Sequence, residues 1–234
     1  MTDAYLQLLT ADAKHRLNNI TTTLKNLITT NSKGLSNEEL IFFQQSLQGF
    51  HRIPVFYGLP KVHKQPVTLC PVVSTSGSLL AIFSTWLDYK MKELLSLVKS
   101  YVKNSFTALE ELQHIHIPDN VLLFTADATS MYTNIDSTTG LTAIRDFLET
   151  NKSHISPTFP TELFLQILQI VMENNVFQFS NTYWLQLTGT AMGTPVACAY
   201  ATVTFGQYEN STILPKYQQQ LLYDKRYIDD IIGI

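Results

Sequence analysis

An α+β fold is what this sequence predicts, on two observations. Apolar residues recur at helical spacing over several long segments, and between these lie short runs rich in valine and aromatic residues that end at turn residues. The strand and helix patterns do not follow the regular β–α–β period of a parallel sheet. The sequence shows no internal repeat, low-complexity tract or flexible linker.

Helical periodicity dominates residues 1–50. The apolar positions at helical spacing are Leu17, Ile20, Leu24, Leu27 and Ile28, followed by Leu40, Phe43 and Leu47. Ser36 and Glu39 have the S-x-x-E form of a capping box, which predicts that a second helix starts there. Gly49 and Pro54 then end the helical pattern.

Helices and strands are both expected in the rest of the chain. Helices are predicted over 79–103, 138–150, 161–174 and 197–205, and strands within 55–78, 121–127, a hairpin at 176–187 and a strand–turn–strand at 226–234. These elements divide the chain into an N-terminal helical segment (1–50), a middle region (51–120) and a third region (121–234) with a helical insertion at about 138–174.

The composition excludes several classes of protein. The chain is 45% hydrophobic and 11% aromatic, so it can bury a core and is not intrinsically disordered. No apolar run approaches the roughly 18 residues of a membrane span, and the N-terminus lacks a signal-peptide pattern. Two cysteines, Cys70 and Cys198, are too few for a disulfide framework or a cysteine-based zinc site, so we expect an intracellular protein. The net charge of −3 argues against binding nucleic acid by bulk charge alone.

Three carboxylates stand in apolar strand patterns. Asp127 closes the strand at 121–127, and Asp229 and Asp230 interrupt the one at 226–234. A buried charge needs a compensating partner, and a divalent metal such as Mg²⁺ is one that suits carboxylate oxygens. Adjacent strand residues point to opposite faces, so Asp229 and Asp230 share a site only if a turn between two strands holds them. The alternative is that all three are solvated turn residues.

The motifs occur in an order that resembles a known family. FYGLPKVHK (56–64), PVVS (71–74), FTADATSMYTNI (124–135), GTAMGTP (189–195) and RYIDD (226–230) stand in this sequence. Together they resemble the reverse transcriptases of Penelope-like retroelements, a group similar to telomerase catalytic subunits. The resemblance spans about residues 50–234 and implies the fingers and a partial palm of a right-hand polymerase, with 51–120 as the fingers-like region. It implies an antiparallel sheet that carries the carboxylates, with helices packed on one face.

The resemblance implies a two-metal site. Asp127, Asp229 and Asp230 match the triad that holds two Mg²⁺ ions, with Mn²⁺ as an alternative, roughly 3.5–4 Å apart. One ion activates the primer 3′-hydroxyl and the other steadies the leaving pyrophosphate. The implied partners are an RNA template, a DNA primer and deoxynucleoside triphosphates, and the implied location is nuclear, with no membrane involved.

Further residues match positions that contact the substrates in this family. Tyr132 matches the aromatic residue that blocks a ribose 2′-hydroxyl, although a tyrosine there also suits a core. Lys61 and Lys64, with His63 between them, match lysines that contact triphosphate and template. Without the aromatic and Pro-Gly context of this motif, they would be a solvated basic loop.

A small-residue turn completes the match. Gly189, Met192, Gly193 and Pro195 match the turn beneath the templating base pair, where glycine allows close backbone approach, although a helix entry needs a similar turn. Gln186 matches a glutamine that often precedes the turn. Arg226 matches a basic residue that precedes the Tyr-x-Asp-Asp box.

The sequence departs from the family at several positions. Cys70 replaces an arginine expected to reach the incoming nucleotide, and a thiol offers no comparable phosphate contact. Cys198 and Asp136 each stand where proline is common. The chain ends at Ile234, whereas the family continues with the rest of the palm, a thumb and often a GIY-YIG endonuclease.

Three functions are compatible with these observations. The first is RNA-templated DNA synthesis, weak or absent in this chain alone because the thumb is absent and Cys70 replaces arginine. The second is an inactive remnant that still binds nucleic acid. The third is RNA-templated RNA synthesis, which uses a similar palm. The departures fit either a diverged lineage or a decaying copy of a retroelement.

Overall fold

The computed structural model describes residues 4–234 as a mixed α/β chain with two separate sheets. The helices are α1 (Thr10–Thr30), α2 (Asn37–Ser46), α3 (Leu79–Lys92), α4 (Ser105–Gln113), α5 (Met131–Asn134), α6 (Ser137–Thr150), α7 (Thr161–Glu173), α8 (Ala197–Tyr208) and α9 (Leu214–Tyr217). Short 3₁₀ helices cover Ser32–Gly34, Leu95–Leu97 and Lys152–His154, and a π-helix covers Glu209–Ile213. The strands are β1 (Tyr5–Leu8), β2 (Val55–Lys61), β3 (Thr68–Ser74), β4 (Phe124–Asp127), β5 (Val176–Phe179), β6 (Thr182–Gln186), β7 (Asp224–Tyr227) and β8 (Asp230–Gly233).

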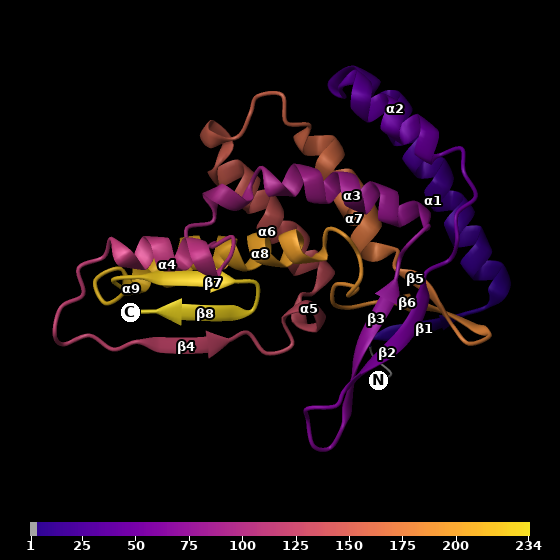
Figure 1. The fold of residues 1–234 in the computed structure, drawn as a ribbon. Coiled ribbons are helices and arrows are strands. Elements are labelled where there is room, and N and C mark those ends of the chain that lie inside the picture. Colours follow the sequence, from indigo (N-terminus) through magenta and orange to yellow (C-terminus); the bar gives the residue numbers. More distant parts are fainter. Residues whose placement is uncertain (1–3) are drawn as a thin grey trace.

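The two sheets lie on either side of a helical centre. Figure 1 shows α3, α6, α7 and α8 between a five-stranded sheet, in the order β1-β6-β5-β2-β3, and a three-stranded sheet, in the order β4-β8-β7. The β2–β3 hairpin projects away from the body of the chain. The apolar core is built mainly from the helices, and its fully buried members include Leu24, Phe43, Phe83, Ile144 and Phe164. The helices therefore hold the two sheets in place.

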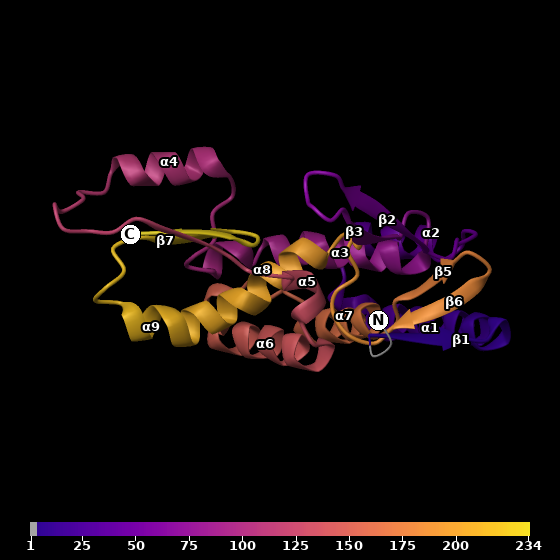
Figure 2. The same cartoon turned by 90° about the horizontal axis from the view of Figure 1, so that it is seen from below.

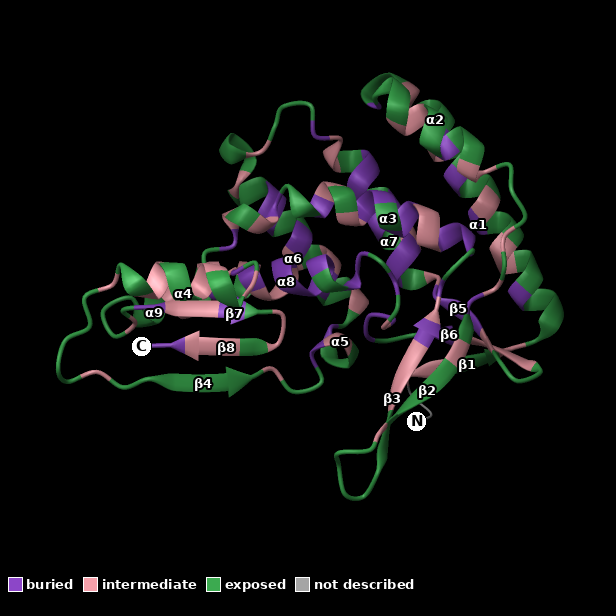
Figure 3. Ribbon diagram, viewed as in Figure 1, coloured by how far each residue is buried: buried purple, intermediate pink, exposed green. Residues whose placement is uncertain are grey.

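The three-stranded sheet is less buried than the helices at the centre of the chain. Figure 3 shows β4 exposed along its length, whereas α3, α7 and α8 are each rich in buried positions. Figure 2 shows the sheet edge-on, with α4 beside one face and α8 and α9 beside the other. Lys225 contacts Glu111 of α4 at 3.3 Å, while the next residue, Arg226, contacts Glu209 at the end of α8. Successive residues of β7 thus reach partners on opposite faces, so helices cover both faces rather than one.

Most of the predicted elements are present, with several differences at their ends. The hairpin at 176–187 and the helices near 138–150 and 161–174 are confirmed as β5–β6, α6 and α7. The helix predicted over 79–103 instead ends at Lys92. Beyond it the backbone of residues 100–102 lies beside β7, where Arg226 N–H donates to the Ser100 carbonyl at 2.6 Å. Pairing with β7 therefore replaces the last turns of that helix.

The first fifty residues are not wholly helical. The segment Tyr5–Leu8 forms β1, which pairs antiparallel with β6. Later in the chain, α4 and the π-helix were also not predicted. None of α4 is buried, so its apolar residues carry no clear inward periodicity for the sequence to show. No helix within 4–234 is both long and apolar enough to cross a membrane.

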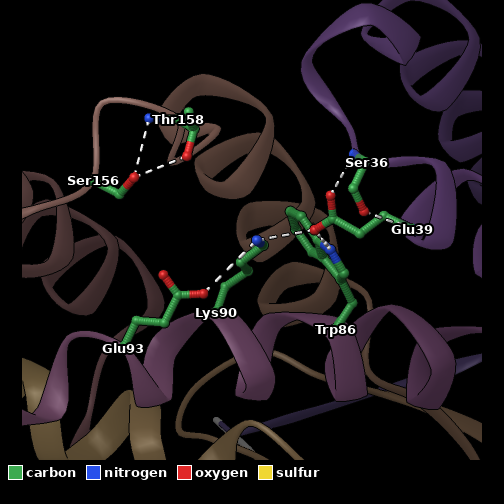
Figure 4. Close-up of polar contacts among 7 residues, drawn as sticks. All are labelled: Ser36, Glu39, Trp86, Lys90, Glu93, Ser156 and Thr158. Atoms are coloured by element: carbon green, nitrogen blue, oxygen red, sulfur yellow. Dashed lines mark hydrogen bonds and ion pairs between the residues drawn. The ribbon is translucent and has the colours of Figure 1, made fainter.

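A polar network joins α2 to α3. The predicted capping box is present: the Glu39 N–H donates to Ser36 Oγ at 3.2 Å, and the Ser36 N–H donates to the Glu39 carboxylate at 2.8 Å. The same carboxylate accepts from Trp86 Nε1 at 2.8 Å and pairs with Lys90 Nζ at 3.0 Å (Figure 4). Partial burial opposes ionisation, but the bonds from Ser36, Trp86 and Lys90 outweigh it and lower the pKa of Glu39 below its usual value.

We expect Glu39→Gln to destabilise the chain by about 1 kcal/mol, because the ion pair with Lys90 is lost while the amide still fits. The folded-state pKa of Glu39 is lowered, so its contribution is present above the unfolded-state pKa and is lost as the pH falls through the folded-state value. Urea unfolding at pH 7 and at pH 3 measures both effects. Glu38→Gln, one residue away and exposed, is the matched control and should change neither midpoint. Equal losses for the two variants at pH 7 would contradict the network.

Candidate functional site: carboxylates at the end of the three-stranded sheet

The strand pairing places two of the predicted carboxylates opposite each other. Strands β4 and β8 are antiparallel, and Asp127 is the direct cross-strand partner of Asp230. Directly opposed residues project to the same face with Cβ atoms roughly 4.5–5.5 Å apart. Both residues are exposed, at the end of the sheet. The two carboxylates therefore lie side by side at one edge, although they are separated by about a hundred residues in sequence.

The third carboxylate lies in the turn between β7 and β8. The predicted hairpin is present, but the turn falls at Ile228 and Asp229, because Tyr227 pairs with Asp230. The Asp229 carbonyl accepts a hydrogen bond from the Ala128 N–H at 2.9 Å, which ties this turn to the end of β4. Ile228 has φ of 58°, in the left-handed region that a β-branched residue rarely adopts. Strain of this kind is often found at functional sites.

The three carboxylates are not buried deeply enough to require a metal ion as a compensating charge. The sequence suggested that carboxylates inside apolar strands would need a compensating partner, whereas Asp127 and Asp230 are exposed and Asp229 is half-buried. That expectation was wrong because β4 is an edge strand with every residue exposed. Within residues 4–234, no group of three or more His, Cys, Asp or Glu side chains is close enough to hold a metal ion. The geometry offers a pair of carboxylates with a third beside it.

A pair of carboxylates still suits a hard cation. Mg²⁺ is commonly bound through one or two carboxylates and completes its shell with water and substrate phosphates. Asp127 and Asp230 offer oxygen ligands from a regular antiparallel pair of strands, and Asp229 follows directly in the turn. The opposed pair Asp127 and Asp230 is therefore chemically suited to Mg²⁺ or Mn²⁺, and Asp229 lies in the adjoining turn.

Tyr132 lies near the turn that holds Asp229. It belongs to α5, is half-buried, and its carbonyl accepts from the Thr190 N–H at 2.6 Å. Burial and then the neighbouring Cys198 thiol, with a smaller effect from Asp229, raise the pKa of the Tyr132 phenol well above its usual range. Tyr132 therefore stays neutral beside the carboxylate turn at physiological pH. The structure thus brings together the proposed sugar-selecting tyrosine and one of the proposed ligands.

The GTAMGTP turn (189–195) contacts β3 of the five-stranded sheet and α5, the helix that follows β4. Gly189 and Gly193 have φ of 78° and 105°, which only glycine adopts easily. A Cβ atom on Gly193 would lie 2.3 Å from the Val73 carbonyl oxygen of β3, and one on Gly189 would lie 2.9 Å from the Thr133 backbone. The glycines are therefore required by close approach to this chain's own backbone. Contact with a nucleotide, which we predicted for them, remains a prediction.

Cys70 joins this turn to the β2–β3 hairpin. Its thiol lies 3.9 Å from Met192 Sδ, next to a backbone bond of 2.8 Å from Val73 N–H to the Met192 carbonyl. Thr75 Oγ1 also donates to the Gly193 carbonyl at 2.8 Å. The position where the reverse transcriptases that this chain resembles carry arginine is thus occupied by a neutral contact with the turn. Pro195 is the last residue of the turn. Ser84 Oγ of α3 accepts a hydrogen bond from the amide of the next residue, Val196, at 3.0 Å.

Four further predicted residues lie apart from the carboxylates. Lys61 ends β2, and His63 and Lys64 belong to the exposed hairpin tip that projects in Figure 1. Their side chains make no hydrogen bond or ion pair with any of the residues that the structure describes. Gln186 is buried, and its Nε2 donates to the Thr188 carbonyl at 2.9 Å, so it supports the segment that leads into the turn. Substrate binding by these residues stays a prediction.

Two other predicted positions have structural roles. Asp136, where proline is common, caps α6 by accepting from the Thr139 N–H at 2.9 Å, and this bond lowers the pKa of Asp136. Arg226 is buried in β7 and bonds to Glu209, a residue that the sequence reasoning missed. The signal was available, since a charged arginine in an apolar strand needs an acidic partner for the same reason as a buried carboxylate.

One sizeable cavity lies away from this site. A space of about 680 Å³ lies among α1, residues 49–54 and the ends of β3 and β5, and none of the three carboxylates lines it. Val73, Thr75 and Thr194 line it from the side of the GTAMGTP turn. A site that handles a nucleic-acid strand is an open surface, so the carboxylate edge remains the better candidate.

Comparison with known proteins places the fold. No protein-family model matches the chain, and no curated protein sequence does either. The fold is similar to that of telomerase from Candida albicans in complex with a TWJ fragment of telomeric RNA, with a TM-score of 0.55 and 10% identity over 91% of this chain. Telomerase from Candida tropicalis is similar in its complex with the TWJ fragment (TM-score 0.57, 10% identity, 80% of this chain) and in an apo form truncated from the C-terminal domain (0.52, 12%, 77%).

The similarity is one of fold and covers part of those proteins. The chain spans 42%, 43% and 36% of the three telomerase chains. A fold similar to that of these telomerase chains is therefore shown for this chain, in agreement with the fold that the motif order implied. The identities of 10–12% carry no residue-by-residue assignment.

Gly193→Ala should destabilise the chain by about 2–4 kcal/mol, because the new methyl group meets the Val73 carbonyl and the left-handed φ is strained. Denaturant unfolding measures this loss. Gly34→Ala is the matched control, since a Cβ there meets nothing within 4 Å. A Gly193→Ala midpoint equal to that of the control would show that the turn does not press on β3.

Proposed function

We propose that this chain carries the metal-binding centre of a reverse transcriptase that copies RNA into DNA. One observation carries the proposal: β4 and β8 pair so that Asp127 faces Asp230, with Asp229 in the adjoining turn. The motif order and the telomerase-like fold support it. The three-stranded sheet is then the palm, and the β2–β3 hairpin belongs to the fingers.

Each group of residues has a different proposed role, which follows from its position. The three carboxylates would hold two Mg²⁺ or Mn²⁺ ions, which supply activation of the primer 3′-hydroxyl and charge neutralisation at the leaving pyrophosphate. Tyr132, neutral and beside Asp229, excludes a 2′-hydroxyl and so favours deoxynucleotides. Lys61, at the end of β2, and Lys64, exposed at the hairpin tip, bind phosphates of the template or of the incoming nucleotide. The GTAMGTP turn supports the templating base pair between these two regions.

The proposed parent is a retroelement related to Penelope-like elements, acting in the nucleus on an RNA template and a DNA primer. The telomerases of similar fold include two in complex with telomeric RNA, which supports an RNA partner here. Because Cys70 provides a neutral contact where an arginine is usual, we expect weak nucleotide binding. That same observation favours the second candidate, a remnant that binds template and primer without extending them.

Replacing Asp229 by Asn should reduce Mg²⁺-dependent primer extension by about a hundredfold or more, because one carboxylate ligand is lost without a change in shape. Extension of a labelled DNA primer on an RNA template, with Mg²⁺ or Mn²⁺, measures this. Asp119→Asn, an exposed carboxylate in the loop before β4, is the matched control and should leave extension unchanged.

The outcomes separate the candidates. Extension that survives Asp229→Asn at the wild-type rate would rule out the metal role. Binding of template–primer by the wild-type chain, with no extension in either metal, would favour the inactive remnant.

Tyr132→Ala should relax sugar selection, because the bulk that excludes a 2′-hydroxyl is removed. Incorporation of ribonucleotides relative to deoxynucleotides should rise by about tenfold or more. Single-nucleotide incorporation with matched deoxy and ribo substrates measures the ratio, and Tyr132→Phe, which keeps the ring, should preserve selection. Wild-type preference for ribonucleotides would instead indicate an RNA-templated RNA polymerase.

A further inference from the structure

Arg226 is the largest fully buried side chain among residues 4–234, and it makes a dense set of contacts. It is 1% exposed. Its Nε and Nη2 donate to the two oxygens of Glu209 at 2.6 and 2.9 Å, a bidentate ion pair. Nη2 also donates to the Thr202 carbonyl of α8 at 3.0 Å, and the guanidinium lies 5.8 Å from the centre of the Phe205 ring. A charge so enclosed cannot serve as a contact for nucleic acid.

Glu209 is matched to this arginine from the other side. It is 9% exposed and begins the π-helix Glu209–Ile213 that follows α8. Its Oε2 also accepts from the buried Ser100 hydroxyl. A one-residue widening of a helix, as in a π-helix, is frequently found at functional sites. Here the widened segment starts with the residue that holds Arg226.

The guanidinium also reaches the carboxylate turn. Arg226 Nη1 donates to the Ile228 carbonyl at 2.8 Å. Ile228 is the left-handed residue of that turn, with φ of 58°, and it stands between Tyr227 and Asp229. A strained backbone conformation persists only when its surroundings fix it. Arg226 is therefore hydrogen-bonded to Ile228, and the backbone conformation of Ile228 sets the orientation of Asp229 and Asp230.

We propose that Arg226, anchored by Glu209, is a positioning residue that holds the Ile228 turn in its left-handed form and so places Asp229 and Asp230 for metal binding. The inference rests on the proposed metal site. Arg226 acts from the face of β7 that packs on α8, and never touches the metal or the substrate. Lysine cannot replace it, because an ammonium lacks the planar fork that reaches Glu209, Thr202 and Ile228 together.

The test is Mn²⁺ binding to chain 1–234, measured from the loss of the free-ion signal in electron paramagnetic resonance. Arg226→Lys should weaken Mn²⁺ binding by about tenfold or more, the usual size for residues that orient metal ligands. In the background of Ile228→Gly, the same Arg226→Lys change should cost little Mn²⁺ affinity, because glycine adopts positive φ without help. Lys225→Gln, the neighbour that contacts α4, is the matched control and should bind Mn²⁺ as the wild type does.

Near-ultraviolet circular dichroism confirms that each variant is folded, and Glu209→Gln, which keeps the shape of the side chain, repeats the comparison if Arg226→Lys does not fold. Unchanged Mn²⁺ affinity in a folded variant overturns the inference. A loss from Arg226→Lys that is equal with and without Ile228→Gly also overturns it, since a merely structural role gives no rescue. Wild-type Mn²⁺ binding that Asp229→Asn does not reduce would instead remove the proposed metal site itself, a pattern that is distinct from either result.

Discussion

Arg226 is buried within a sheet, and a guanidinium there is stable only if its donors find acceptors. Glu209 and the carbonyls of Thr202 and Ile228 meet that requirement, while the Arg226 backbone bonds to Ser100. In doing so they connect the β7–β8 hairpin to α8, to the π-helix and to the segment after α3. The edge that carries the three aspartates is thus attached to the helical core through this internal charge, together with the backbone bonds between β7 and residues 100–102.

The GTAMGTP turn links the five-stranded sheet to the segment that follows β4 of the three-stranded sheet. Its Gly193 presses against β3, its Gly189 presses against α5, and α8 begins shortly after its end. The turn therefore touches the hairpin that carries Lys61 and Lys64 on one side and the helix that carries Tyr132 on the other. In the proposed reverse transcriptase, a template and an incoming nucleotide would span the two sheets, with the carboxylates at one end.

Local chemistry explains what could be predicted from the sequence. The Ser36–Glu39 capping box, the β5–β6 hairpin and the β7–β8 hairpin depend on neighbours within a few residues, and all three are present. That Asp127 lies near Asp230 was expected only from a motif resemblance, because no local rule joins strands so far apart; their direct pairing is a structural finding. Exposure of β4, the partner of Arg226 and the end of α3 all depend on contacts between distant segments. Each is set by tertiary packing, which periodicity does not record.

Whether Asp127, Asp229 and Asp230 form one metal site can be measured directly on the chain. Fe²⁺ bound in place of Mg²⁺ reduces added hydrogen peroxide to hydroxide and a hydroxyl radical, and added ascorbate regenerates the Fe²⁺. The radicals cut the backbone close to the ion, so mapping the cuts locates the metal. We expect cuts near residue 127 and near 228–230 in the same molecule, both suppressed by excess Mg²⁺. Cuts confined to other segments, or cuts at only one of these two strands, would contradict a shared site.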